Sequence, residues 1–185
     1  MKWTAAGIGR AMALHFERRH LVIVPNCNWT GHECDLLVVT QKLLVIDVEI
    51  KISRSDLKAD FGKDKWYHNW DFAIDGPWTG RYEDRRRRDV PRRVWKHYYC
   101  MPASIWKPEL LETIPAASGV LLLTAAGTDV QIRSIRPATA SRTAEKLSPE
   151  AAIDIARLAS LRMWDSYRKL EQQTSRSRNG DQGCG

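Results

Sequence analysis

The chain has 185 residues and a mass of 21.2 kDa, with 43% hydrophobic and 28% charged residues, which predicts one compact domain with a sizeable core. These proportions exclude a collagen-like chain, a wholly disordered chain and a membrane bundle. No apolar run reaches the roughly 18 residues that a spanning helix needs, and the first residues lack the apolar stretch of a secretory signal. We therefore expect an intracellular protein that has no membrane partner.

Positive charge is concentrated in one segment of the chain. The formal net charge is +7, from 29 Lys and Arg against 22 Asp and Glu. The segment 81–96 (RYEDRRRRDVPRRVWK) holds eight basic and three acidic residues, so it supplies +5 of that charge. Because neutralising phosphates releases condensed counterions, a polyanion is the natural partner of such a segment. The alternative interpretation is a solvated, self-repelling loop.

The cysteines follow no metal-binding or disulfide pattern. Cys27, Cys34, Cys100 and Cys184 form neither a CxxC pair nor the framework of a disulfide-rich domain. A metal site made of Cys27, His32 and Cys34 is conceivable, but the spacing favours scattered reduced thiols. No zinc is therefore expected.

The N-terminal half predicts a helix, a strand and a hairpin, in that order. The helix covers residues 4–20, and the short apolar strand 21–24 follows it and ends at a breaker formed by Pro25 and Asn26. Two β-branched runs, 33–40 and 43–51, then predict a hairpin with a tight polar turn between them.

The middle of the chain predicts one more helix and then an insertion. The helix begins at Ser53, whose side chain can cap it, with Asp56 completing a capping box, and it ends near Asn69. Residues 70–96 mix Gly, Pro, Trp and Arg without a clean period. We interpret them as a basic insertion, a kind of long loop that usually has a function.

The C-terminal half predicts short strands at 97–101, 119–124 and 129–133, a short helix at 109–114, and a long closing helix that begins at Ser148 and Pro149. Residues 173–185 are expected to be a disordered tail, which leaves one domain over 1–172. Helices at the start, middle and end of a series of strands predict a mixed sheet covered by helices, in the α/β or α+β class.

Acidic residues and a lysine gather at one end of the predicted hairpin. Alternation along 43–51 places Asp47, Glu49 and Lys51 on one face of the strand, whereas its other face is apolar. The start of the first hairpin strand lies beside the end of the second, so Glu33 and Asp35 fall near Glu49. Such a group of carboxylates with a lysine predicts a pocket for a hard divalent cation such as Mg²⁺.

This combination of residues suits phosphodiester cleavage. Carboxylates hold the cation against a phosphate, the cation polarises the phosphoryl oxygen and acidifies bound water, and a lysine positions that water or stabilises developing charge. The alternative is an exposed ion-pair ladder on a half-buried hairpin.

The same residues resemble the PD-(D/E)xK nuclease superfamily, which has the restriction-endonuclease-like fold. The resemblance rests on Asp35, Glu49 and Lys51 in the contexts HECDLLVV and VIDVEIKISRSDLKADFGKDKW, and it covers roughly residues 14–163. The segments EIKISRSDLKAD, HYYCMP, GVLLLTAAGTDV and ARLASLRM are similar to the MmcB-like DNA-repair branch and to related phage proteins. The chain departs from the family's pattern because it has no Pro before Asp35 and carries the basic insertion.

The resemblance implies an α/β fold with an αβββαβ core, in which helices flank a mixed central sheet, and the sequence adds a long C-terminal helix. It implies Mg²⁺-dependent cleavage of DNA, with Mn²⁺ as a substitute cofactor. Asp35 and Glu49 would ligate the cation, Lys51 would be the catalytic lysine, and Glu17 is the candidate for an acid that some members place on the first helix. Glu33, the other acid of the predicted hairpin, completes the expected catalytic and metal-binding set.

Basic side chains are expected to bind the nucleic-acid backbone. The set comprises six arginines of the insertion and two lysines of the helix after the motif: Arg85, Arg86, Arg87, Arg88, Arg92, Arg93, Lys58 and Lys65. For the two lysines, plain solvation is the alternative.

Together these expectations describe a Mg²⁺-dependent DNA endonuclease or nickase that acts in repair, recombination or phage DNA processing, in a bacterium or a phage-infected host. DNA is the expected partner, and a homodimer stays open because many nucleases of this kind pair to cut both strands. The alternatives are a non-catalytic nucleic-acid-binding module on the same fold and an RNA-processing nuclease. We also expect alanine at Glu49 or Lys51 to abolish cleavage while folding stays largely intact.

Overall fold

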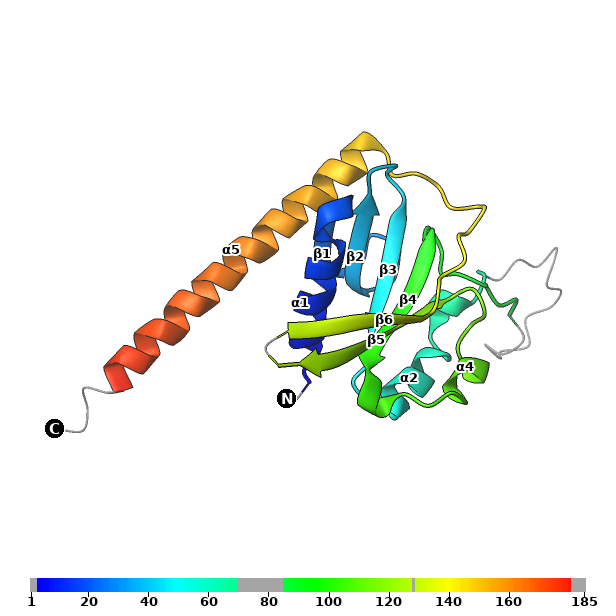
Figure 1. Cartoon of the computed structure of the whole chain (residues 1–185). Coiled ribbons are helices and arrows are strands. Elements are labelled where there is room, and N and C mark those ends of the chain that lie inside the picture. The colour runs from blue at the N-terminus through cyan, green and yellow to red at the C-terminus, as the bar shows by residue number, and fades with distance from the viewer. Residues whose placement is uncertain (1–2, 70–84, 128, 181–185) are drawn as a thin grey trace.

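A computed structural model describes residues 3–69, 85–127 and 129–180 of the chain (Figure 1). Its centre is a six-stranded sheet in which the strands lie in the order of the sequence. The strands are β1 (His20–Cys27), β2 (Cys34–Thr40), β3 (Val45–Ile50), β4 (Lys96–Pro102), β5 (Gly119–Ala126) and β6 (Asp129–Arg136). The helices are α1 (Ala5–Phe16), α2 (Arg54–Asp60), α4 (Leu110–Thr113) and α5 (Pro149–Gly180), with the 3₁₀ turns η1 (Glu17–Arg19), η2 (Asp64–Trp66) and η4 (Ala103–Ile105).

The sheet is mixed, as the sequence predicts for an α/β fold. Strand β2 is antiparallel to both of its neighbours, β1 and β3. Strands β3, β4 and β5 are parallel, and β6 returns antiparallel to β5. Within the described ranges, no helix is both long and apolar enough to cross a lipid bilayer.

Three apolar clusters hold the helices against the sheet. On one face, Ile8 and Met12 of α1 pack on alternate residues of β2 and β3, including Val38 and Val48. The other face is divided: the start of α5 covers one part, where Ile155 packs on β1 and β2, and α2 and α4 cover the other part. Alternation directs the side chains of β3 that are not in the α1 cluster to this divided face. The acids of β3 therefore lie between two apolar clusters.

The first helix is shorter than predicted and the first strand is longer. Thr4 caps α1 by accepting a hydrogen bond from the Gly7 N–H at 3.1 Å, and the helix ends at Phe16 instead of residue 20. The expected breaker at Pro25 and Asn26 is wrong, because β1 continues to Cys27. β1 is an edge strand, and an edge strand tolerates a proline since one side of its backbone needs no partner.

The helix after the motif begins as predicted but ends early. Ser53 caps α2 by accepting a hydrogen bond from the Asp56 N–H at 3.1 Å, which confirms the cap. The helix ends at Asp60, nine residues before Asn69, and Gly62 follows in a turn. The predicted placement of Lys58 and Lys65 on one continuous helix is therefore wrong.

The closing helix α5 is longer than expected. Its first turns contact β1, and in Figure 1 the rest of the helix extends away from the sheet. It continues to Gly180, so the prediction of a disordered tail from residue 173 is wrong over 173–180. No Gly or Pro between Pro149 and Gly180 interrupts the helix. Residues 181–185 and most of the basic insertion, 70–84, lie outside the described residues.

Candidate active site

A group of buried charged side chains lies where β3 ends and α2 packs on the sheet. Asp47 and Asp60 are fully buried, and Glu49, Lys51 and Lys65 are exposed by 1%, 2% and 8%. Asp47 and Glu49 point to the divided face because they alternate with the apolar residues of β3 that face α1. Burial excludes the alternative of an exposed ion-pair ladder on this hairpin.

Lysine ammonium groups and carboxylates alternate in this group. Lys51 Nζ lies 2.9 Å from Glu49 Oε2 and 3.0 Å from Asp60 Oδ1. Lys65 Nζ lies 2.6 Å from Glu49 Oε1 and 3.1 Å from Asp60 Oδ2. The two lysines thus each bridge the same pair of acids, which compensates charges that would be very costly to bury alone.

Asp60 joins α2 to the rest of this ion-pair network. Its carboxylate also accepts hydrogen bonds from the Tyr99 hydroxyl at 2.6 Å and the Trp66 indole N–H at 3.3 Å, and Lys63 Nζ lies 2.9 Å away. Burial alone would raise the pKa of Asp60, but the charges of Lys65 and Lys51 outweigh burial and hold the pKa well below its usual range. Asp60 therefore stays ionised.

The two bridging lysines stay protonated. Burial alone would lower the pKa of Lys51 and Lys65, but the charge of Glu49, together with that of Asp60, raises both values above the ordinary pKa of lysine. Neither side chain can take a proton from water at neutral pH. Alanine at Glu49 or Lys51 would break a buried ion pair at a cost of about 3–5 kcal/mol, so unchanged folding is not expected.

Asp47 lies between two histidines. His32 Nε2 is 3.0 Å from Asp47 Oδ2, and His97 Nε2 is 3.9 Å from the same oxygen. His97 Nδ1 lies 2.9 Å from the Ser118 hydroxyl. Complete burial lowers the pKa of His97 to about 3, so its imidazole is neutral at neutral pH. Among the described residues, Asp47 Oδ1 and His97 Nε2 are buried without a hydrogen-bond partner.

The predicted metal ligands are not brought together as a set. Glu49 and Lys51 are in direct contact, as expected. Asp35 instead accepts the Ile50 N–H at 2.7 Å and lines a separate cavity beside α1. Burial and then the charge of Glu49 raise the pKa of Asp35, so the two acids are near enough to repel each other.

The other two predicted acids lie outside the buried group. Glu33 is exposed and lies at the wall of the cavity described below. The prediction that Glu17 shares the cation is wrong, because Glu17 precedes β1 at the opposite end of the sheet. The strand from His20 to Asn26 alone spans about 20 Å.

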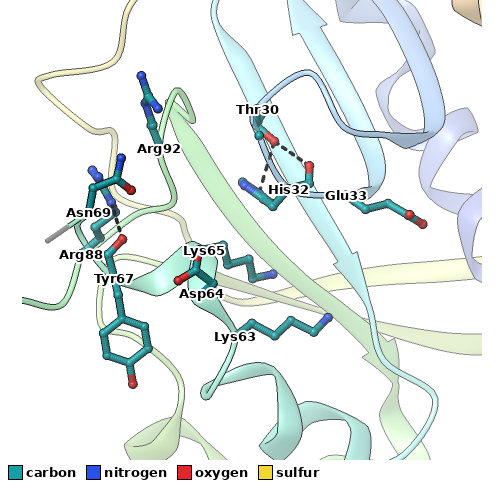
Figure 2. A pocket seen from close by; sticks show the side chains of 11 residues that line it. Thr30, His32, Glu33, Lys63, Asp64, Lys65, Tyr67, Asn69, Arg88 and Arg92 are labelled. Carbon is teal, nitrogen blue, oxygen red and sulfur yellow. Dashed lines mark hydrogen bonds between the residues drawn. The ribbon is translucent and has the colours of Figure 1, made fainter. Parts of the chain in front are cut away.

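A cavity of about 320 Å³ opens above the buried group (Figure 2). Its walls come from the segment before β2, the turn after α2 and the segment before β4, and they include Lys63, Lys65, Arg88 and Arg92 against the acids Glu33 and Asp64. Two of its wall residues reach the buried acids: His32 contacts Asp47, and Lys65 contacts Glu49. The cavity is therefore mainly cationic and leads to the acids.

Only some arginines of the basic segment line the cavity. Arg92 and the half-buried Arg88 line the cavity, whereas the exposed Arg93 packs on the Trp29 ring with its guanidinium 5.3 Å from the ring centre. Arg85 forms an ion pair with Asp64. Arg86 and Arg87, which follow Arg85 in the chain, are exposed, and Lys58 is exposed on α2. Lys65 is buried, which excludes the alternative of a plainly solvated lysine, and it borders the cavity.

Sequence reasoning missed Asp60, His97 and the liganding potential of Asp47. Asp47 shares a face with Glu49, and this alternation was the available signal. His97 pairs with Asp47 in the parallel register of β3 and β4, which the sequence does not reveal. Asp60 enters the site only because α2 ends there and turns back over the sheet.

The comparisons with known proteins bear on the fold. No family model and no curated protein matches the chain. A solved structure of a protein of unknown function from Silicibacter pomeroyi is similar, with 20% identity and a TM-score of 0.52, over 94% of this chain and 96% of that chain. At this identity the likeness concerns the fold alone. The chain thus has an α/β fold, with a six-stranded mixed sheet and a long C-terminal helix, that is similar along nearly its whole length to that structure.

Proposed function

We propose that the chain is a divalent-metal-dependent nuclease that hydrolyses phosphodiester bonds of DNA on a restriction-endonuclease-like fold. The order of the elements supports this fold, since α1, β1, β2, β3, α2 and β4 follow one another as in an αβββαβ core. Glu49 and Lys51 at the end of β3 match the acid and the lysine of the family's motif.

The cationic cavity above the buried acids carries the proposal. A phosphodiester in this cavity would accept charge-assisted hydrogen bonds from the lysines and arginines of its wall. Because His32 contacts Asp47 and Lys65 contacts Glu49, that phosphate would lie one side chain away from both carboxylates. A metal-dependent phosphodiesterase needs this combination of an anion site and adjacent acids.

The residues present fit a divalent cation, although the acids differ from those expected. Ligand atoms of Asp47, Glu49 and His97 lie within 4.8 Å of one another, and Asp47 Oδ1 has no partner among the described residues. We assign the cation to Asp47 and Glu49, so Asp47 takes the part expected of Asp35. The cation, Mg²⁺ with Mn²⁺ as a substitute, would polarise the phosphoryl oxygen and acidify water.

In the proposed nuclease, Lys51 and Lys65 act as permanently protonated cations. Lys51 and Lys65 hold Glu49 between them, and their raised pKa values exclude a role as general base. Lys65 borders the cavity, so its ammonium group, held by Glu49 and Asp60, would place a fixed positive charge beside a phosphate bound there.

A non-catalytic nucleic-acid-binding module is the second candidate, and one observation favours it. Both carboxylate oxygens of Glu49 are occupied by ammonium groups, at 2.6 Å from Lys65 and 2.9 Å from Lys51. A cation that binds Glu49 has to displace one of these contacts. The two candidates therefore differ in whether the acids bind a metal ion at all.

A cleavage panel separates the candidates. The purified chain is incubated with linear, supercoiled, single-stranded and branched DNA and with structured RNA, in Mg²⁺, Mn²⁺ or EDTA. We expect metal-dependent cleavage of at least one DNA and none in EDTA. DNA binding without cleavage in either metal would favour the binding module, and cleavage of RNA alone would identify an RNA-processing nuclease.

The salt dependence of DNA binding tests the cavity as the phosphate site. Each phosphate contact contributes about 0.9 to the slope of log K against log salt concentration. We expect Arg88→Gln combined with Arg92→Gln to flatten that slope by about 1.8 on duplex DNA. The matched control is Arg18→Gln combined with Arg19→Gln, which removes the same charge at the far end of β1. Equal slopes in all three proteins would show that the cavity arginines contact no phosphate.

A further inference from the structure

Two histidines and a cysteine converge on Asp47 from separate parts of the sheet. His32 and Cys34 stand at the entrance of β2, and His97 lies beside Asp47 on the neighbouring strand β4. Ligand atoms of His32, Cys34 and Asp47 lie within 4.8 Å of one another. His32 Nε2 is 3.0 Å from Asp47 Oδ2 and 3.9 Å from Cys34 Sγ, and His97 Nε2 is 3.9 Å from the same Asp47 oxygen.

Three separations in this group are close to those between the ligands of one tetrahedral ion. Bond lengths of about 2.0–2.3 Å to nitrogen, oxygen and sulfur place neighbouring ligand atoms about 3.3–3.6 Å apart. The observed distances, from 3.0 to 3.9 Å, lie on both sides of this range. The ligand atom of His97 groups with those of Asp47 and Glu49, whereas those of His32 and Cys34 form a second group with Asp47. Closing the site around one ion therefore requires His97 to move toward His32 and Cys34.

One buried atom at this point lacks the partner that an ion would supply. His97 Nε2 has no hydrogen-bond partner among the described residues, although the side chain is fully buried. The Ser118 hydroxyl lies 2.9 Å from His97 Nδ1 and can accept its proton, which leaves the Nε2 lone pair directed toward Asp47. At 3.9 Å, Nε2 is too far from Asp47 Oδ2 for a hydrogen bond. A cation between these two atoms would give His97 Nε2 a partner, and an outer hydrogen bond like that of Ser118 is typical of a metal-bound histidine.

The donor atoms select the kind of ion. Two imidazoles, one thiolate and one carboxylate suit Zn²⁺, whereas Mg²⁺ prefers oxygen ligands and six-fold coordination. A thiolate and a carboxylate also neutralise the two charges of Zn²⁺, so the closed site carries no net charge in the interior. His32 borders the cavity, which gives the ion a path from solvent.

We propose that His32, Cys34, Asp47 and His97 bind one Zn²⁺ ion and release the Cys34 thiol proton to solvent on binding. Four protein ligands leave no open position, so the ion is structural and joins the entrance of β2 to β3 and β4. This inference does not rest on the nuclease proposal. Glu49 is not a ligand of the zinc ion and remains available, with the second oxygen of Asp47, for the catalytic cation.

Metal titration of the intact chain tests the site. After dialysis against a chelator, we expect the protein to bind one equivalent of Zn²⁺ with a rise in Tm. Co²⁺ in place of Zn²⁺ should give a thiolate-to-cobalt charge-transfer band. We expect Cys34→Ser to lose this band, and His32→Gln to weaken Zn²⁺ binding by at least about 100-fold, the upper end of the loss when an outer-shell partner is removed. Cys100→Ser is the matched control, because Cys100 is equally buried but packs in the cluster with α1.

The outcomes also separate this site from the proposed nuclease. Zn²⁺ binding should persist in Glu49→Gln, even though we expect that variant to lose cleavage. A Co²⁺ complex without a thiolate band, or equal Zn²⁺ affinity in wild type and His32→Gln, would overturn the site. His32 is partly exposed, so its substitution provides a test that does not depend on replacing a buried cysteine. Zinc binding by a protein that cleaves no nucleic acid would support the zinc site and contradict the proposed nuclease activity.

Discussion

Asp60→Ala is expected to lower the free energy of unfolding by about 3–5 kcal/mol, the usual cost of removing one partner from a buried ion pair. The substitution leaves Lys51 and Lys65 sharing the single carboxylate of Glu49 in the protein interior. It also removes the acceptor of the Tyr99 hydroxyl. Because a domain is stable by only about 5–15 kcal/mol, chemical denaturation should show a large loss, and the variant should be partly unfolded at raised temperature.

Asp64→Ala is the control for this prediction. Asp64 lies four residues further on and pairs with Arg85, but its side chain is 70% exposed. An exposed pair contributes only about 0.2–1 kcal/mol, so the control should unfold almost like the wild type. Equal losses in the two variants would show that the buried network contributes no special stability.

The Asp60 contribution should also depend on pH. The pKa of Asp60 is lowered in the folded state, so its stabilisation is complete at neutral pH. It is lost as the pH falls below the ordinary aspartate value of about 4. The difference in unfolding free energy between the wild type and Asp60→Ala should therefore narrow in acid. A difference that stays constant down to pH values of about 2 would contradict this account of the ion pairs.

Glu49→Gln is expected to reduce metal-dependent cleavage by at least about 100-fold, the effect of losing one electrostatic contact in an active site. The amide keeps the size of the side chain but cannot neutralise a bound cation. Cleavage rates are measured on the best substrate of the panel, with circular dichroism to confirm that the variant is folded. Glu109→Gln is the matched control, since Glu109 is exposed at the start of α4 and does not line the cavity. Full activity in Glu49→Gln would remove this residue from the mechanism.

Local patterns in the sequence predicted much of this fold. The predicted cap at Ser53 marks the start of α2, because its side-chain oxygen accepts a backbone N–H. The period of two along β3 predicted which residues share a face, and Glu49 and Lys51 lie together as a result. These features depend on neighbours in the chain, which is why the sequence alone reveals them.

Asp35 shows where alternation fails. Cys34 and Leu37 pack in the same cluster, although strict alternation places residues three apart on opposite faces. The pleat is therefore interrupted at the start of β2. The facing strand has Asn26 at this level with a φ of 51°, a left-handed conformation that Asn tolerates. Asp35 turns toward α1 as a consequence, so the hairpin pattern predicted the correct strand pairing but not the direction of this side chain.

The remaining site residues meet through contacts that are distant in sequence. Lys65 and Asp60 reach Glu49 and Lys51 because α2 ends after seven residues and the following turn folds back over β3. His97 lies fifty residues from Asp47 and becomes its neighbour through the parallel pairing of β3 and β4. Such contacts follow from the packing of the whole sheet, and the local periodicity of the sequence does not predict them.

Mn²⁺ anomalous scattering from crystals of the chain with a short DNA duplex would test the nuclease account at its metal centre. The account predicts an anomalous peak at coordinating distance, about 2.2 Å, from carboxylate oxygens of both Asp47 and Glu49, with a phosphate in the cationic cavity beside it. Crystals that contain ordered DNA but no such peak, with Glu49 still bound to Lys51 and Lys65, would contradict the account and identify a module that binds DNA without cutting it.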